Sequence, residues 1–115
     1  MLFLTEEDEL KNKANIKCLY FYSSWMPYNK KMLSIINKME EKYNDIAYIA
    51  IDVDNFSGIC HRFNINSIPT ILILLNGEEI KKVNGLILTS ALRRIFSDIY
   101  TDNTKVNGDS NAKES

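Results

Sequence analysis

The chain is poor in cysteine, glycine and proline, and it has no long apolar run. Its 115 residues include only two cysteines, Cys18 and Cys60, whereas small secreted domains held by disulfides usually carry more. We expect two free thiols, although sequence alone leaves a Cys18–Cys60 disulfide open because it gives no distance. No segment approaches the roughly 18 apolar residues that span a bilayer. The start has no basic, apolar leader, so we expect a cytoplasmic address and no membrane association.

An excess of charge of one sign is also missing. The 14 basic and 15 acidic residues give a net charge of −1, which provides no general attraction to nucleic acid or to an anionic membrane. There is no stripe of basic and aromatic residues and no glycine-rich phosphate loop. The pairs Lys30-Lys31 and Lys81-Lys82 are interpreted as solvated charges. The composition therefore gives no reason to expect a nucleic-acid partner.

Metal and cofactor sites are not expected either. His61 is the only histidine and is adjacent to Cys60, but neighbours on a helix point about 100° apart and do not converge on one ion. Asp52 and Asp54 resemble a carboxylate pair, yet they follow a strand directly. We expect Asp54 or Asn55 to cap the next helix rather than to perform acid–base chemistry.

What the chain does contain is a regular succession of apolar segments. A short helix is predicted over residues 5–13, a buried strand over 16–24, and a long helix after Pro27, which is tolerated in a first helical turn. A second buried strand is predicted over 46–53, a short helix over about 55–63, and a last amphipathic helix from Leu88. Asn76-Gly77 lies between two strands and supplies the positive backbone angles of a tight hairpin turn.

These elements predict one domain over residues 1–100. The first two strands are joined through a helix and should be parallel, and the last two form an antiparallel hairpin. We therefore predict an α/β fold with a mixed four-stranded sheet and helices on both faces. Residues 101–115 are almost entirely polar, so we predict a disordered tail.

Several short stretches resemble the thioredoxin family. "YFYSSW" is similar to the strand before the family's active site, and Trp25 matches the tryptophan that precedes the family's first cysteine. "NSIPT" is similar to the family's cis-proline loop. "LLNGEEI" resembles the family hairpin, and Asn84-Gly85 falls at its glycine bend. The resemblance covers residues 5 to 100 and implies the thioredoxin fold, with a cis peptide at Pro69. The spliceosomal thioredoxin-like family is a related possibility, which "SIPT" fits less well.

The resemblance fails where the family performs its chemistry. The family carries Cys-x-x-Cys after the tryptophan, whereas Met26, Pro27, Tyr28 and Asn29 stand here. A thiolate at a helix N-terminus is stabilised by the free backbone N–H groups and attacks disulfides, which neither a thioether nor an amide can do. The family's buried Asp and Lys are matched by Tyr20 and Ala50. No catalytic residue is therefore expected in this loop.

An extended peptide lies along this face in the family and bonds to the backbone of the residue before the cis-proline. The resemblance therefore implies a binding or scaffold module without redox activity, because strand addition needs no thiol. Its protein or peptide partner would contact seven residues: Trp25, Met26, Pro27, Tyr28, Ile68, Pro69 and Thr70.

Two other functions remain open on the sequence. The chain could be an oxidoreductase with residual or monothiol activity through Cys60, serving cell redox homeostasis. It could also be a structural subunit that assembles through its helix faces. The oligomeric state does not follow from the sequence.

Overall fold

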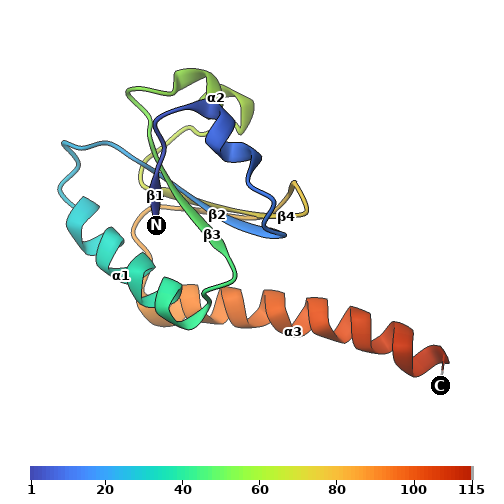
Figure 1. The fold of residues 1–115 in the computed structure, drawn as a ribbon. Coiled ribbons are helices and arrows are strands. Elements are labelled where there is room, and N and C mark those ends of the chain that lie inside the picture. Colours follow the sequence, from blue (N-terminus) through green and yellow to red (C-terminus); the bar gives the residue numbers. More distant parts are fainter. Residues whose placement is uncertain (115) are drawn as a thin grey trace.

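The computed structural model describes the backbone of residues 1–114 and the side chains of residues 1–101. A twisted five-stranded sheet in the order β1-β3-β2-β4-β5 has helices on both faces (Figure 1). In chain order the elements are β1 (Leu2–Phe3), η1 (Glu7–Lys11), β2 (Ile16–Tyr22), α1 (Asn29–Lys42), β3 (Ala47–Asp52), α2 (Ser57–Arg62), β4 (Thr70–Leu75), β5 (Glu78–Asn84) and α3 (Thr89–Glu114).

The predicted α/β fold is confirmed, with one strand more than expected. β2 pairs in parallel with β3, and β4 pairs antiparallel with both β2 and β5. The additional strand, β1, pairs in parallel with β3 through Leu2 and Phe3. Two residues are too few to show a periodic pattern, and β1 exists only because it pairs with the open edge of β3. The short helix predicted over residues 5–13 is the 3-10 helix η1.

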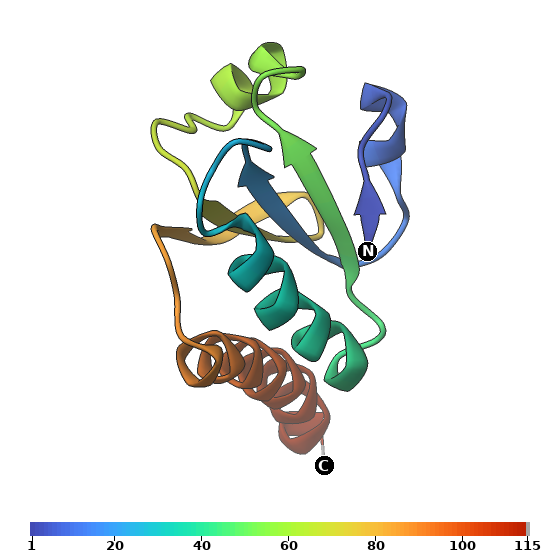
Figure 2. The same ribbon diagram turned by 90° about the vertical axis from the view of Figure 1, so that its left-hand side faces the viewer.

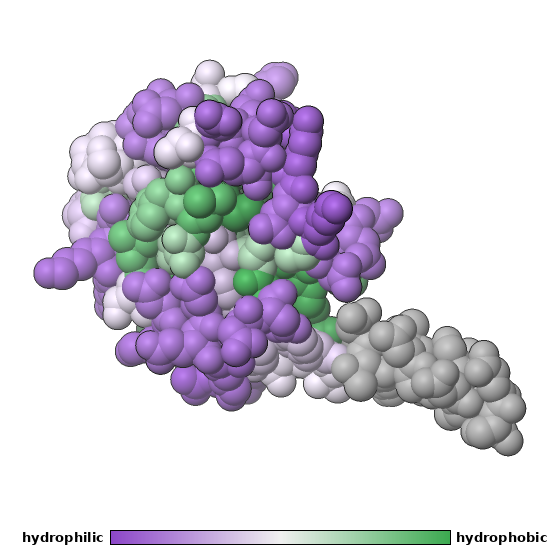
Figure 3. Space-filling view, viewed as in Figure 1, coloured by the Kyte–Doolittle hydropathy of each residue, from purple (hydrophilic) through white to green (hydrophobic). Residues whose placement is uncertain are grey.

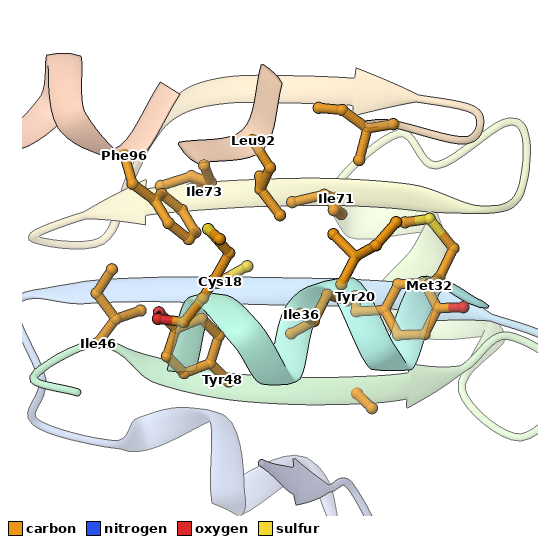
Figure 4. Packing of buried hydrophobic residues seen from close by; sticks show 14 of the residues in the cluster. Cys18, Tyr20, Met32, Ile36, Ile46, Tyr48, Ile71, Ile73, Leu92 and Phe96 are labelled. Atoms are coloured by element: carbon orange, nitrogen blue, oxygen red, sulfur yellow. The ribbon is translucent and has the colours of Figure 1, made fainter. Parts of the chain in front are cut away.

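The sheet separates two apolar clusters, because successive strand residues point to opposite faces. On one face, Cys18 and Tyr20 of β2 pack with residues of α1 and α3, among them Ile36 and Phe96 (Figure 4). On the other face, α2 and its flanking loop cover a smaller cluster, against which Cys60 packs. The two cysteines thus lie on opposite sides of the sheet, and both are free thiols.

The loops confirm two predictions and correct a third. Asn76 and Gly77 both have positive φ angles, 51° and 85°, as the predicted hairpin turn requires. The Ile68–Pro69 peptide bond is cis. The predicted cap of α2 is wrong, because α2 begins after Phe56 with no side-chain cap. The Asp54 carboxylate instead accepts a hydrogen bond from the buried Ser23 hydroxyl at 2.7 Å.

Helix α3 packs beside α1 on one face of the sheet (Figure 2) and extends beyond it (Figure 1). Its backbone continues to Glu114, through the segment for which composition predicts a disordered tail, and the side chains from residue 102 lie outside the described part. Within the described residues, no helix is both long and apolar enough to cross a membrane. On the surface, Leu2 and Phe3 of β1 are exposed, and Figure 3 shows a continuous apolar area where β1 lies.

Candidate functional site

The strand register brings the two predicted site loops to the same end of the sheet. Phe21, near the end of β2, pairs with Thr70 at the start of β4. The loop that follows β2 and the loop that precedes β4 therefore emerge at the same edge. Met26 of the first loop lies in the apolar cluster under α1 and α3, and Ile68 of the second packs against that cluster.

Tyr20 and Asn29 are joined inside this site. The Tyr20 hydroxyl donates a hydrogen bond to Oδ1 of Asn29 at 2.9 Å. Tyr20 is only 1% exposed. Burial, reinforced by the neighbouring Tyr22, raises the pKa of the Tyr20 phenol, so it remains a neutral donor at physiological pH. The sequence gives no sign that these two positions interact, whereas in the structure their side chains are hydrogen-bonded.

Aromatic rings fill the space around Tyr20. In the pairing of β2 with β3, Tyr20 lies opposite Ala50, whose small methyl side chain leaves room for the tyrosine ring. Tyr22 stacks on Tyr20 with ring centroids 5.4 Å apart. Phe3 of β1 meets Tyr22 edge-on at 6.3 Å. The positions that the family resemblance assigns to a buried acid and a buried lysine thus form part of a neutral aromatic layer.

Met26 does not form part of the exposed surface that the sequence suggested. It is only 7% exposed and lies in the core, and its N–H donates to the Ser23 carbonyl at 3.0 Å. The loop turns back on itself there, which points the thioether inward. Trp25 and Tyr28, by contrast, are 71% and 51% exposed, and Pro27 between them is exposed. The exposed apolar part of the loop is Trp25, Pro27 and Tyr28.

The cis-proline loop contributes backbone rather than side-chain surface. Pro69 and Thr70 are buried and Ile68 is half-buried. The Thr70 hydroxyl donates to the Ser67 carbonyl at 2.7 Å, which fixes the loop internally. Within the described residues, neither the N–H nor the C=O of Ile68 has a hydrogen-bond partner. Both groups are free to pair with an added strand.

Cys60 lies within α2 and is half-buried. It lines a shallow groove of about 440 Å³ together with Ser57, His61 and Ile68. Burial raises the pKa of the Cys60 thiol, so little thiolate is present at neutral pH. Burial also raises the pKa of Cys18, to about 12. Among the described residues, no three His, Cys, Asp or Glu side chains are grouped to hold a metal ion.

Comparison with known proteins identifies the family. The family model described as Thioredoxin matches residues 4–98, which is most of the chain. The chain belongs to the thioredoxin family. The fold is that of known thioredoxins. The structure of oxidised thioredoxin from Plasmodium falciparum superposes on this chain with a TM-score of 0.78 at 22% identity, and the match covers 86% of this chain and 97% of that one.

The curated relatives are similar to this chain at 26–28% identity over part of their length. Thioredoxin H2 of Arabidopsis thaliana is 27% identical over 78 residues, which are 68% of this chain and 59% of that protein. Thioredoxin-2 of Saccharomyces cerevisiae is 28% identical, over 69% of this chain and 76% of that one. The Arabidopsis protein named thioredoxin-like protein CXXS2 is 26% identical, over 67% and 50%. Of these three relatives, two are named as thioredoxins and one as thioredoxin-like.

Proposed function

We propose that this thioredoxin-family chain does not exchange disulfides and instead binds a protein or extended peptide through the face formed by its two site loops. The observation that carries the proposal is the Tyr20–Asn29 hydrogen bond. Asn29 stands where the family resemblance places the second cysteine, and Tyr20 stands where it places the buried acid. The Tyr20 hydroxyl has its acceptor in the Asn29 side chain, and this hydrogen bond holds the site together without a thiol.

The other half of the proposal concerns binding. Trp25, Pro27 and Tyr28 present apolar surface, and the backbone of Ile68 has a free donor and a free acceptor at the same end of the sheet. An extended peptide that pairs with Ile68 would have its side chains beside Trp25. Tryptophan and tyrosine are the residues that most often dominate binding energy at such interfaces.

The redox half is tested by restoring the cysteines. Reduction of a disulfide in a model protein, with dithiothreitol as electron source, is compared for the natural chain and for Met26→Cys/Asn29→Cys. We expect the natural chain to match the rate of dithiothreitol alone and the restored chain to exceed it. Turnover by the natural chain that Cys60→Ser abolishes would instead assign the chemistry to Cys60 and overturn the proposal.

The binding half is tested with selected peptides. Peptides are taken from a random display library on the immobilised chain, and their affinities are measured by fluorescence anisotropy. Trp25→Ala should weaken binding at least about tenfold, as loss of a central aromatic contact does. The matched control is Ile80→Ala, which trims an exposed apolar side chain on the distant edge strand β5. Equal affinities for the two variants, or no selectable peptide, would contradict the proposal.

A further inference from the structure

A second concave surface lies on the other side of Pro27, between the start of α1 and the start of α3. It is a groove of about 490 Å³, formed where these two helices lie side by side (Figure 2). We call it the lysine groove, and its defining residues are Pro27, Lys30, Lys31, Ile35, Lys38 and Leu88. Leu88 is 68% exposed, so a large apolar side chain stands open to solvent beside the apolar floor.

The charges around this floor all have one sign. Lys30, Lys31 and Lys38 line the groove, and no carboxylate does. Within the described residues, none of these three lysines takes part in an ion pair. The whole chain has a net charge of −1, so the positive charge here is a local concentration. A site of this kind favours a ligand that combines negative charge with an apolar group.

The spacing of the lysines indicates the size of that ligand. Lys30 and Lys38 are eight positions apart on α1, about 12 Å along the helix axis at roughly 1.5 Å per residue. Ser34 lies midway between them, at i+4 from Lys30. Two carboxylates can span the same distance when they are about four residues apart in an extended chain. They can also do so about two turns apart on a helix. A short acidic peptide segment therefore reaches both ends of the groove.

We propose that the lysine groove is a docking site for an acidic segment of another protein, whose apolar side chain packs between Pro27 and Leu88 while its carboxylates meet Lys30, Lys31 and Lys38. This second surface adjoins the proposed peptide-binding face and shares Pro27 with it, but the inference does not rest on that face. Lysine stems also add apolar contact area beside the bound side chain, since their methylene groups lie along the surface.

The groove suits a peptide better than the other anionic macromolecules. Its floor is aliphatic and no aromatic side chain lines it, so nucleic-acid bases would have no ring on which to stack. A membrane surface contacts an amphipathic helix whose apolar face projects into the lipid. Here the apolar residues line a hollow between two helices.

The test uses the full chain and three fluorescent probe peptides, with phosphatidylserine vesicles and a single-stranded oligonucleotide as alternative ligands. One alternates glutamate pairs with leucines. The second replaces each glutamate by glutamine, and the third replaces each leucine by serine. Binding is measured by anisotropy at low and high salt, and the contact surface is located by amide chemical shifts. We expect only the peptide with both glutamate and leucine to bind well. Its binding should weaken with salt, because the lysines are exposed to solvent, and should shift the resonances of Lys30, Ser34 and Leu88.

Variants then separate this site from nonspecific charge attraction. Lys30→Glu/Lys38→Glu should weaken binding at least about tenfold, through loss of two favourable charge contacts and gain of two repulsive ones. Lys13→Glu/Lys81→Glu makes the same change of net charge at exposed sites away from the groove and should bind as the natural chain does. Trp25→Ala should also bind normally, which distinguishes this site from the proposed peptide face.

Three results would overturn the inference. The first is an equal loss of affinity in both double variants, and the second is absence of binding by the glutamate–leucine peptide. The third is binding only to phosphatidylserine vesicles or to a single-stranded oligonucleotide, which would assign the lysines to a different class of ligand. Circular dichroism of each variant checks that it has kept its fold.

Discussion

The hydroxyl of Tyr20 donates a hydrogen bond to the side-chain carbonyl of Asn29 across 2.9 Å, and so joins the middle of the central strand β2 to the first residue of α1. Because Tyr20 is buried, its hydroxyl needs an acceptor within the protein, and Asn29 supplies it.

The first prediction concerns this pair. Tyr20→Phe removes the donor and should lower the free energy of unfolding by about 1 kcal/mol. Asn29→Ala leaves a buried hydroxyl without a partner and should cost about 1–3 kcal/mol. A double-mutant cycle from urea unfolding should give a coupling of about 1 kcal/mol. Tyr28→Phe removes a hydroxyl from an exposed ring and serves as control. Additive effects at Tyr20 and Asn29 would show that the hydrogen bond contributes nothing to stability.

The second prediction concerns the thiols. Cys60 is half-buried and Cys18 is fully buried in the opposite cluster. A thiol reagent such as dithionitrobenzoate should therefore label the native chain slowly at Cys60 and leave Cys18 unlabelled until urea unfolds the protein. Cys60→Ser should remove the native-state reaction, and Cys18→Ser should leave it in place. Fast labelling of Cys18 in the native chain would mean that β2 opens readily.

The third prediction is a dependence of stability on alkaline pH. The Cys18 pKa is raised from an ordinary value near 9 to about 12, so the folded chain holds this proton more tightly than the unfolded chain does. The contribution is fully present below pH 9 and declines as pH rises toward 12. Burial raises the pKa of Tyr20 and Tyr48 in the same direction. Urea unfolding at increasing pH should show a steeper loss for the natural chain than for Cys18→Ala, and identical slopes would contradict this assignment.

The fourth prediction compares two leucines near the start of α3. Leu92 is fully buried against the sheet, whereas Leu88 is largely exposed. Leu92→Ala should cost about 2–5 kcal/mol by leaving a cavity between α3 and the sheet. Leu88→Ala should change stability by less than about 0.5 kcal/mol. Thermal unfolding of both variants measures the difference. Comparable losses at both sites would mean that Leu88 is packed in solution.

The fifth prediction concerns the polar tail. Residues 101–115 contain one branched apolar residue and no aromatic residue, so they have little apolar surface with which to offset the entropy of ordering. Deletion of residues 102–115 should therefore leave the melting temperature unchanged. A lower melting temperature after this deletion would show that the segment contributes to the stability of the fold.

The sequence was sufficient for those parts of the fold that local chemistry determines. The hairpin turn follows from Asn76-Gly77, whose backbone angles few other residues adopt. The long helix α1 follows from the spacing of Met32, Ile36 and Met39, all of which are buried. Strand β1 could not be found in this way, because its two residues carry no periodicity and pair with a strand more than forty positions away.

The site was harder to predict than the fold. Strand β2 is apolar on both faces, so its sequence does not say which side chains turn toward α1. The burial of Met26 depends on the loop turning back to Ser23, and the Tyr20–Asn29 contact depends on where α1 begins. The alternation of strand side chains places Tyr20 on the same face as Cys18 and Tyr22, but only tertiary packing brings Asn29 to it. The cis bond at Pro69 followed from the family resemblance.

The pairing of Tyr20 with Ala50 has a consequence for substitutions at this site. An aspartate introduced at Tyr20 would be buried opposite a methyl group, without a cation beside it. A lysine introduced at Ala50 would meet the tyrosine ring, and a cysteine at Asn29 would take away the acceptor of the tyrosine hydroxyl. Each of these three substitutions, made alone, is therefore expected to lower the stability of the folded chain. Tyr20, Asn29 and Ala50 therefore act as one packed unit, in which a change at one position alters the environment of the other two.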